Sequence, residues 1–147
     1  MAPEIVVRHA RKTDFPSVVA LLAAAQLPPD DAASWIDHFV VAERDGDVVG
    51  AAGLELYGDS ALLRSVVTAN DVRGTGTGAA LTNAAIEWAR AMRIESVYLL
   101  TTSAGDWFPR FGFERITRDD VPAEVKASVQ FQLVTCSTAT VMRRKLT

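Results

Sequence analysis

A glycine-rich segment at residues 70–79, NDVRGTGTGA, gives the sequence its clearest chemical signal. It lies between a predicted strand and a predicted helix. Because glycine has no Cβ, alternating glycines let successive backbone N–H groups approach a ligand closely. The helix that follows adds its unpaired N-terminal N–H groups and the positive end of its dipole. The segment predicts an anion cradle suited to a pyrophosphate, with Arg73 adding positive charge at its edge.

Two common nucleotide-binding motifs do not match this segment. A dinucleotide fingerprint needs an acidic ribose ligand at the end of the following strand, and a phosphate-binding P-loop needs a closing Lys-Ser or Lys-Thr pair. The sequence has neither at the required place. A glycine-rich turn that merely caps the helix also accounts for the pattern, so the residues alone leave both interpretations open.

Arg64 is a second candidate for chemistry, because it lies in the otherwise apolar run ALLRSVVTA at residues 61–69. An unpaired buried guanidinium is costly, so a buried arginine requires an anionic partner. If residues 58–59 form a two-residue turn, Glu55 and Tyr57 share one face with Arg64, and Glu55 lies diagonal to it. We predict either a structural Glu55–Arg64 ion pair, or a catalytic pair in which Arg64 binds a substrate carboxylate and Glu55 accepts a proton.

The composition narrows the class of protein. The 147 residues, 49% hydrophobic and 22% charged, predict a single globular domain over residues 1–147. The one cysteine, Cys136, excludes an intrachain disulfide and a multi-cysteine zinc site, and we expect no metal. A net charge of -3 gives no basic field for nucleic acid. With no apolar run of ~20 residues and no signal-peptide core, we expect a soluble cytoplasmic protein.

Hydrophobic periodicity predicts an α+β domain with one βαβ crossover. An antiparallel meander precedes the glycine segment, and a helix with an apolar stripe from Leu81 to Met92 follows it. We predict strands at residues 4–10, 38–44, 48–57, 60–69, 96–101, from 113 onward and at 140–145. The other predicted helices begin near residues 13–16, pass through residues 35–36 and span residues 104–111.

This order of motifs resembles the GNAT superfamily of acetyltransferases. The resemblance starts at residues 8–14, continues through the glycine loop and includes WFPRFGF at residues 107–113. It implies a mixed, mostly antiparallel sheet that is splayed between two parallel strands and flanked by helices on both faces. More narrowly, residues 62–67, 98–102 and the tail at 121–142 resemble small N-acetyltransferases linked to arsenic-resistance operons.

The resemblance implies that acetyl-CoA is the co-substrate. The strand before the loop would bond the pantetheine arm through its backbone, and the loop would bind the pyrophosphate. The implied cofactor-binding residues are Val66, Val67, Thr68, Arg73, Gly74, Thr75, Gly76, Thr77, Gly78, Ala79 and Phe108.

The sequence departs from the family's pattern at Phe108, where many relatives place a tyrosine that protonates the departing CoA thiolate. Phenylalanine has no proton to give, so catalysis would rest on positioning and on polarisation of the carbonyl. The arsenic-linked group tends to carry Cys-Pro where this chain has Thr135-Cys136, which weakens any role for Cys136. Residues 101–103 either line a site or cap the next helix through Ser103.

The leading prediction from this resemblance is an N-acetyltransferase that acetylates a primary amine of a small, amino-acid-like molecule in a ternary complex. Glu55 and Arg64 are its predicted catalytic residues. One alternative is an acetyltransferase for protein N-termini or lysines, and another is a non-catalytic acyl-CoA-binding or regulatory module. We expect neither a nucleic-acid nor a membrane partner, and the resemblance favours a homodimer.

Overall fold

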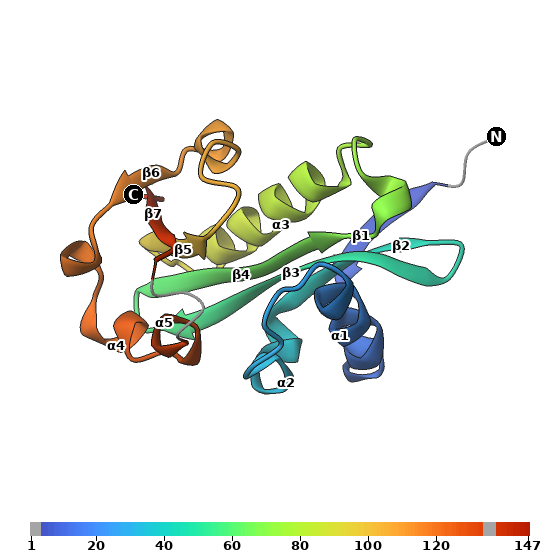
Figure 1. Cartoon of the computed structure of the whole chain (residues 1–147), viewed down its shortest axis with the longest axis horizontal. Helices are drawn as coiled ribbons and strands as arrows, with labels where there is room; N and C mark the ends of the chain where they lie inside the picture. Colours follow the sequence, from blue (N-terminus) through green and yellow to red (C-terminus); the bar gives the residue numbers. More distant parts are fainter. Residues whose placement is uncertain (1–3, 134–137) are drawn as a thin grey trace. The chain divides into compact units, whose positions relative to one another are not determined.

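The computed structural model describes residues 4–133 and 138–147, in which seven strands form one mixed sheet (Figure 1). The hydrogen-bonded order is β1-β2-β3-β4-β5-β7-β6, with β4 and β5 parallel. The strands are β1 (Ile5–His9), β2 (Phe39–Arg44), β3 (Asp47–Tyr57), β4 (Ser60–Thr68), β5 (Ser96–Thr101), β6 (Glu114–Ile116) and β7 (Thr140–Lys145). The predicted fold class is confirmed.

Five α-helices and five single-turn 3₁₀ helices occur in the described residues. The α-helices are α1 (Phe15–Ala24), α2 (Ala32–Trp35), α3 (Thr77–Ala91), α4 (Ala123–Lys126) and α5 (Val129–Gln132). The 3₁₀ turns are η1 (Lys12–Asp14), η2 (Ile36–His38), η3 (Asn70–Val72), η4 (Phe108–Phe111) and η5 (Arg118–Asp120). In the described part of the chain, no helix is long and apolar enough to cross a membrane. Cys136 lies outside the described residues.

The chain divides into two compact units. The first comprises residues 1–54 and 65–87, and the second comprises residues 55–64 and 88–147. Strands β3 and β4 each pass from one unit to the other, so each unit contains a part of both strands. The single domain expected from the sequence stays a prediction.

The first unit has helices on both faces of its strands, with α1 and α3 on opposite sides of β2 and β3 (Figure 1). Val18 and Leu22, one helical turn apart on α1, are fully buried against the same apolar cluster as Phe39 and Val41 of β2. The i, i+4 spacing on the helix and the i, i+2 spacing on the strand thus meet in one core.

Two glycines of β3 let neighbouring side chains approach the strand closely. Gly53 pairs with Phe39 of β2, and a Cβ on Gly53 would lie 2.3 Å from the Phe39 ring, so the ring covers the glycine backbone. A Cβ on Gly50 would lie 2.8 Å from Leu81 of α3. Both neighbours occupy space that any larger residue would need.

An ion pair joins β1 to the start of α1. Arg8 donates to both carboxylate oxygens of Asp14, at 2.8 and 3.1 Å, and to Glu43 of β2 at 3.4 Å. Asp14 also accepts the backbone N–H of Arg11 at 2.7 Å. The hydrogen bonds from Arg8 are the main reason that the pKa of Asp14 lies below its ordinary value.

We expect Asp14→Asn to lower stability at neutral pH and to have little effect in strong acid. A carboxyl whose pKa is depressed by folding adds stability above its unfolded pKa, and this stability is lost as pH falls through the folded pKa. Urea unfolding at pH ~7 and at pH ~2 measures both differences. A pH-independent difference would show that the carboxylate's charge contributes nothing.

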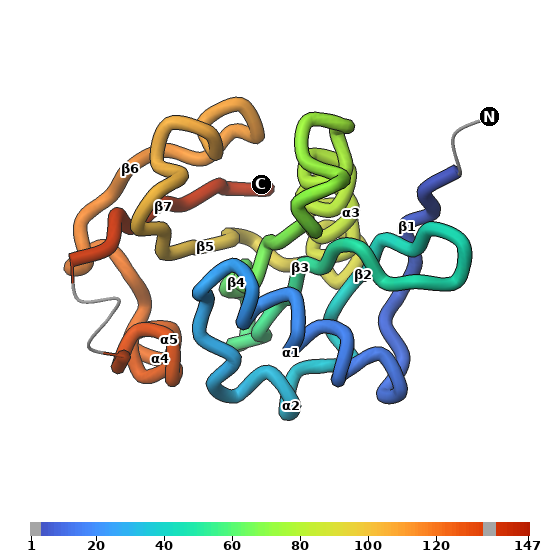
Figure 2. Tube along the Cα trace, turned by 45° about the vertical axis from the view of Figure 1, so that its right-hand side comes forward, coloured from blue at the N-terminus to red at the C-terminus, as the bar shows by residue number. Residues whose placement is uncertain are grey.

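The second unit is built on β5 and its neighbours, and Figure 2 shows β7 running beside β5. β5 begins and ends at the predicted residues, and its apolar sequence is explained by burial of residues 97–99. The predicted helix at 104–111 is too long at its start: residues 105–107 form a turn, and only η4 is helical. It ends where predicted, because Gly112, at φ 85°, forms a left-handed cap. Helices α4 and α5 have four residues each, too few to show a helical period in the sequence.

Candidate active site

The glycine loop joins η3 to α3 in the first unit, as the sequence predicts. Gly74 and Gly76 have φ of 80° and 84°, and α3 begins at Thr77. A Cβ on either glycine would meet nothing within 4 Å, so their backbone conformation, and not crowding, requires glycine there. The first N–H groups of α3 have no intrahelical acceptor, and the loop before them is exposed at residues 73–76. This arrangement can bind a phosphate-like anion.

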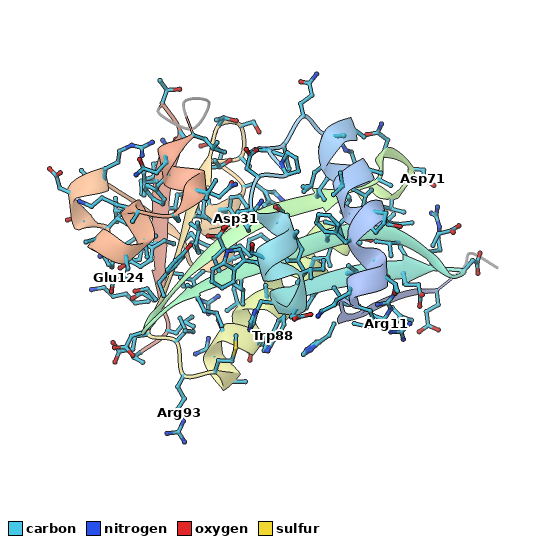
Figure 3. The ribbon with its side chains drawn as sticks, turned by 90° about the horizontal axis from the view of Figure 1, so that it is seen from below. Arg11, Asp31, Asp71, Trp88, Arg93 and Glu124 are labelled. Carbon is cyan, nitrogen blue, oxygen red and sulfur yellow. The ribbon has the colours of Figure 1, made fainter. Side chains whose placement is uncertain are left out.

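An ion pair holds the start of this loop. Arg44, at the end of β2, donates to Asp71 of η3, which is labelled in Figure 3. The hydrogen bond from Arg44 is also the main reason that the pKa of Asp71 is lowered. The charge of Asp71, which would oppose an anion at the neighbouring loop, is therefore partnered within the protein.

The strand that enters the loop contains a feature without a sequence signal. Ser65, in the middle of β4, has φ of 59°, a left-handed conformation that is uncommon for a residue other than glycine. Such a residue inside a strand is typical of a bulge, and strained backbone often accompanies function. Pairing of β4 with β5 stops at Leu63–Leu99, just before Ser65, although both strands continue. Of the residues predicted to face the pantetheine, Val67 is buried, whereas Val66 and Thr68 are half-buried.

The second unit contains the predicted Glu55–Arg64 ion pair. Arg64 Nη1 donates to Glu55 Oε2 at 2.8 Å, and the two side chains are 1% and 0% exposed. Tyr57 donates its hydroxyl to the other oxygen, Oε1. β3 ends at Tyr57 and β4 begins at Ser60, so the two-residue turn and the shared face are confirmed. The roles of the pair stay predictions.

This pairing limits what the two side chains can do. A buried carboxylate with one oxygen on a guanidinium and the other on a phenol is well satisfied. Tyr57, which is half-buried, is the member of the group that is more exposed than the other two. A substrate that binds Arg64 must therefore add to, or replace, part of the contact with Glu55.

Phe108 lies in an aromatic cluster of the second unit. It is 7% exposed, and its ring centroid lies 5.0 Å from that of Trp107 and 5.8 Å from that of Phe113. The turn before η4 is capped by Thr101, whose hydroxyl accepts the N–H of Ala104 at 2.9 Å. Residues 101–103 thus supply a cap, as one alternative predicted, but the capping residue is Thr101 and not Ser103.

Among the described residues, no group of three or more His, Cys, Asp or Glu side chains is placed to hold a metal ion.

Comparison with protein families gives a match to the acetyltransferase (GNAT) domain over residues 35–115. The curated relatives include an amino-acid acetyltransferase of Actinobacillus pleuropneumoniae serotype 3, 30% identical over 99 residues, which are 66% of this chain and 23% of that protein. The amino-acid acetyltransferase of Ralstonia nicotianae is 32% identical over 99 residues, 66% of this chain and 22% of that protein. The chain thus spans about a quarter of the length of these relatives.

Two solved structures extend the comparison to the whole fold. N-acetylglutamate synthase from Neisseria gonorrhoeae, complexed with coenzyme A and N-acetyl-glutamate, superposes with a TM-score of 0.85 at 21% identity, covering 100% of this chain and 36% of that one. Rv2747 from Mycobacterium tuberculosis, in complex with CoA, has a TM-score of 0.81 at 25% identity, covering 97% of this chain and 99% of that one.

Proposed function

Because this chain belongs to the GNAT acetyltransferase family, we propose that it transfers the acetyl group of acetyl-CoA to the primary amine of a small, amino-acid-like molecule. The glycine loop before α3 carries the proposal. Gly74 and Gly76 supply the backbone conformation, and the start of α3 supplies N–H donors and a positive dipole end for the CoA pyrophosphate.

The reaction needs one nucleophilic attack and three proton movements. The ammonium group of the substrate gives a proton to a base, and its nitrogen then attacks the thioester carbonyl. The nitrogen of the tetrahedral adduct loses its second proton to water, the C–S bond breaks, and the CoA thiolate leaves a neutral amide behind. Backbone N–H groups stabilise the charge that develops on the carbonyl oxygen. Because Phe108 has no proton to donate, water protonates the thiolate.

Arg64 and Glu55 support an amino-acid-like substrate. An arginine matches a carboxylate in shape and charge, and Glu55 is a carboxylate that can accept the amine's proton directly or through water. The names of the relatives agree with this class, since they are amino-acid acetyltransferases. The alternative assigns the pair to stability alone, and its complete burial supports that alternative.

A thiol-release assay with acetyl-CoA and a panel of amines tests the proposal. We expect thiol release with small amines that carry a carboxylate, and markedly less with their amides and with peptides of the same terminal residue. Release only with peptides would favour the protein-acetylating alternative. Absence of release with every amine, together with measurable acetyl-CoA binding, would favour a non-catalytic acyl-CoA-binding module, which the missing hydroxyl at Phe108 also supports.

The resemblance of residues 62–67 and 98–102 to the arsenic-linked group supports a narrower proposal, an arsenic-containing amino acid as substrate. Such a compound therefore belongs in the amine panel. The family resemblance also supports a homodimer, and sedimentation of the purified chain measures its oligomeric state.

A further inference from the structure

The hydroxyls of Thr75 and Thr77 form two hydrogen bonds within the glycine loop, which together are called the hydroxyl lock below. Thr75 Oγ1 donates to the carbonyl of Val72 at 2.5 Å, and it lies 2.7 Å from Thr77 Oγ1. A hydroxyl has one proton to donate. Since Thr75 uses its proton on Val72, the proton between the two threonines belongs to Thr77, and the order of donation is Thr77 to Thr75 to Val72.

The hydroxyl lock spans the part of the loop that glycine makes flexible. Gly74 and Gly76 stand on either side of Thr75, and glycine loses more conformational freedom on ordering than any other residue. Val72 is fully buried and Thr77 is 5% exposed, so the residues at both ends of this series of hydrogen bonds are fixed in the first unit. The backbone bond from Thr75 N–H to the same Val72 carbonyl is long, at 3.3 Å, so the hydroxyl makes the shorter of the two contacts.

We propose that Thr75 and Thr77 are positioning residues that hold the glycine loop in its anion-binding shape before the cofactor arrives. The inference rests on the proposed function, because it takes acetyl-CoA as the ligand of this loop. A loop ordered in advance binds more tightly, since less conformational freedom is lost on binding. The two hydroxyls act through the backbone of the loop and are themselves engaged with each other.

Thr75→Val tests the proposal, because valine keeps the shape of threonine and removes the hydroxyl. Thr75→Ser keeps the hydroxyl and is the rescue variant. Thr117→Val is the matched control: it also removes a threonine hydroxyl that makes a hydrogen bond, to Asp120 at 3.1 Å, but in the second unit. The three readouts are hydrogen exchange of residues 73–79 without cofactor, the Kd for CoA by calorimetry, and kcat at saturating acetyl-CoA.

We expect Thr75→Val to speed hydrogen exchange in the free loop and to raise the Kd for CoA roughly 5- to 30-fold, as for two lost hydrogen bonds. Its kcat at saturating acetyl-CoA should stay within about twofold, since the lock is needed for binding and not for the chemical step. Thr75→Ser and Thr117→Val should resemble the unmodified protein in all three measurements.

Two results would overturn the proposal. Unchanged CoA affinity in Thr75→Val would show that the lock is not needed for binding. A weakened affinity with unchanged exchange in the free loop would show that Thr75 contacts the ligand directly. If the unmodified protein binds no CoA at all, the proposed function fails, whereas the exchange measurement still decides whether the hydroxyls order the loop.

Discussion

Gly76→Asp is expected to abolish acetyl-CoA binding and to leave the fold largely intact. Aspartate tolerates the left-handed backbone better than most residues, and a Cβ at this position meets nothing within 4 Å. Its carboxylate would stand in the loop that is proposed to receive the pyrophosphate. Two like charges ~4 Å apart repel by ~1–4 kcal/mol in water or near a protein surface, and a pyrophosphate carries more than one charge, so we expect a loss of about 100-fold or more.

Gly76→Asn is the matched control, because asparagine has the same size and the same tolerance of a positive φ but carries no charge. Calorimetric titration with acetyl-CoA should give a much smaller loss for asparagine than for aspartate. Thermal unfolding should be similar for the two variants. Unchanged affinity in Gly76→Asp would remove the loop from the cofactor site.

Arg64→Met is expected to lower kcat/KM for a carboxylate-bearing amine by roughly 10- to 150-fold, the value of a lost charge-assisted hydrogen bond of ~1.5–3 kcal/mol. The same variant should leave acetyl-CoA affinity unchanged. The decisive measurement compares one amine that has a carboxylate with its amide. If both lose activity equally, Arg64 does not bind the carboxylate and the ion pair is structural.

Stability must be measured alongside, because Arg64→Met leaves Glu55 buried without its arginine. Removing one partner of a buried ion pair costs ~3–5 kcal/mol, whereas replacing both can be neutral. The double variant Arg64→Met, Glu55→Gln has no unpaired buried charge, so its free energy of unfolding shows whether the instability of the single variant comes from the charge left on Glu55. The single variant Glu55→Gln should lower kcat and remove the acidic limb of the pH–rate profile if Glu55 is the base.

Much of this arrangement could be predicted because its signals are local. The glycine loop could be predicted from its glycines, which a left-handed backbone favours. The helix after it could be predicted from its apolar stripe. The Glu55–Arg64 contact followed from one assumption, the length of the turn at residues 58–59, combined with the two-residue period of a strand. Once the turn length was correct, the diagonal neighbours were determined.

The missed features depend on contacts that no local pattern records. Serine has no special preference for a positive φ, so the backbone at Ser65 could not be predicted from its residue type. The order of donation from Thr77 through Thr75 to Val72 depends on how the loop folds back on itself. Thr101, and not Ser103, accepts the N–H of Ala104, because the chain turns directly after β5, which ends at Thr101.

The contact between Phe39 and Gly53 has a consequence for how this sequence can change over generations. The ring fills the volume above the glycine, so a larger residue at 53 is acceptable only after position 39 has become smaller. Either substitution made first lowers stability. A larger residue at position 53 clashes with the Phe39 ring, and a smaller residue at position 39 leaves a cavity above Gly53. The two positions should therefore covary among descendants of this chain, with one large and one small residue in every surviving combination.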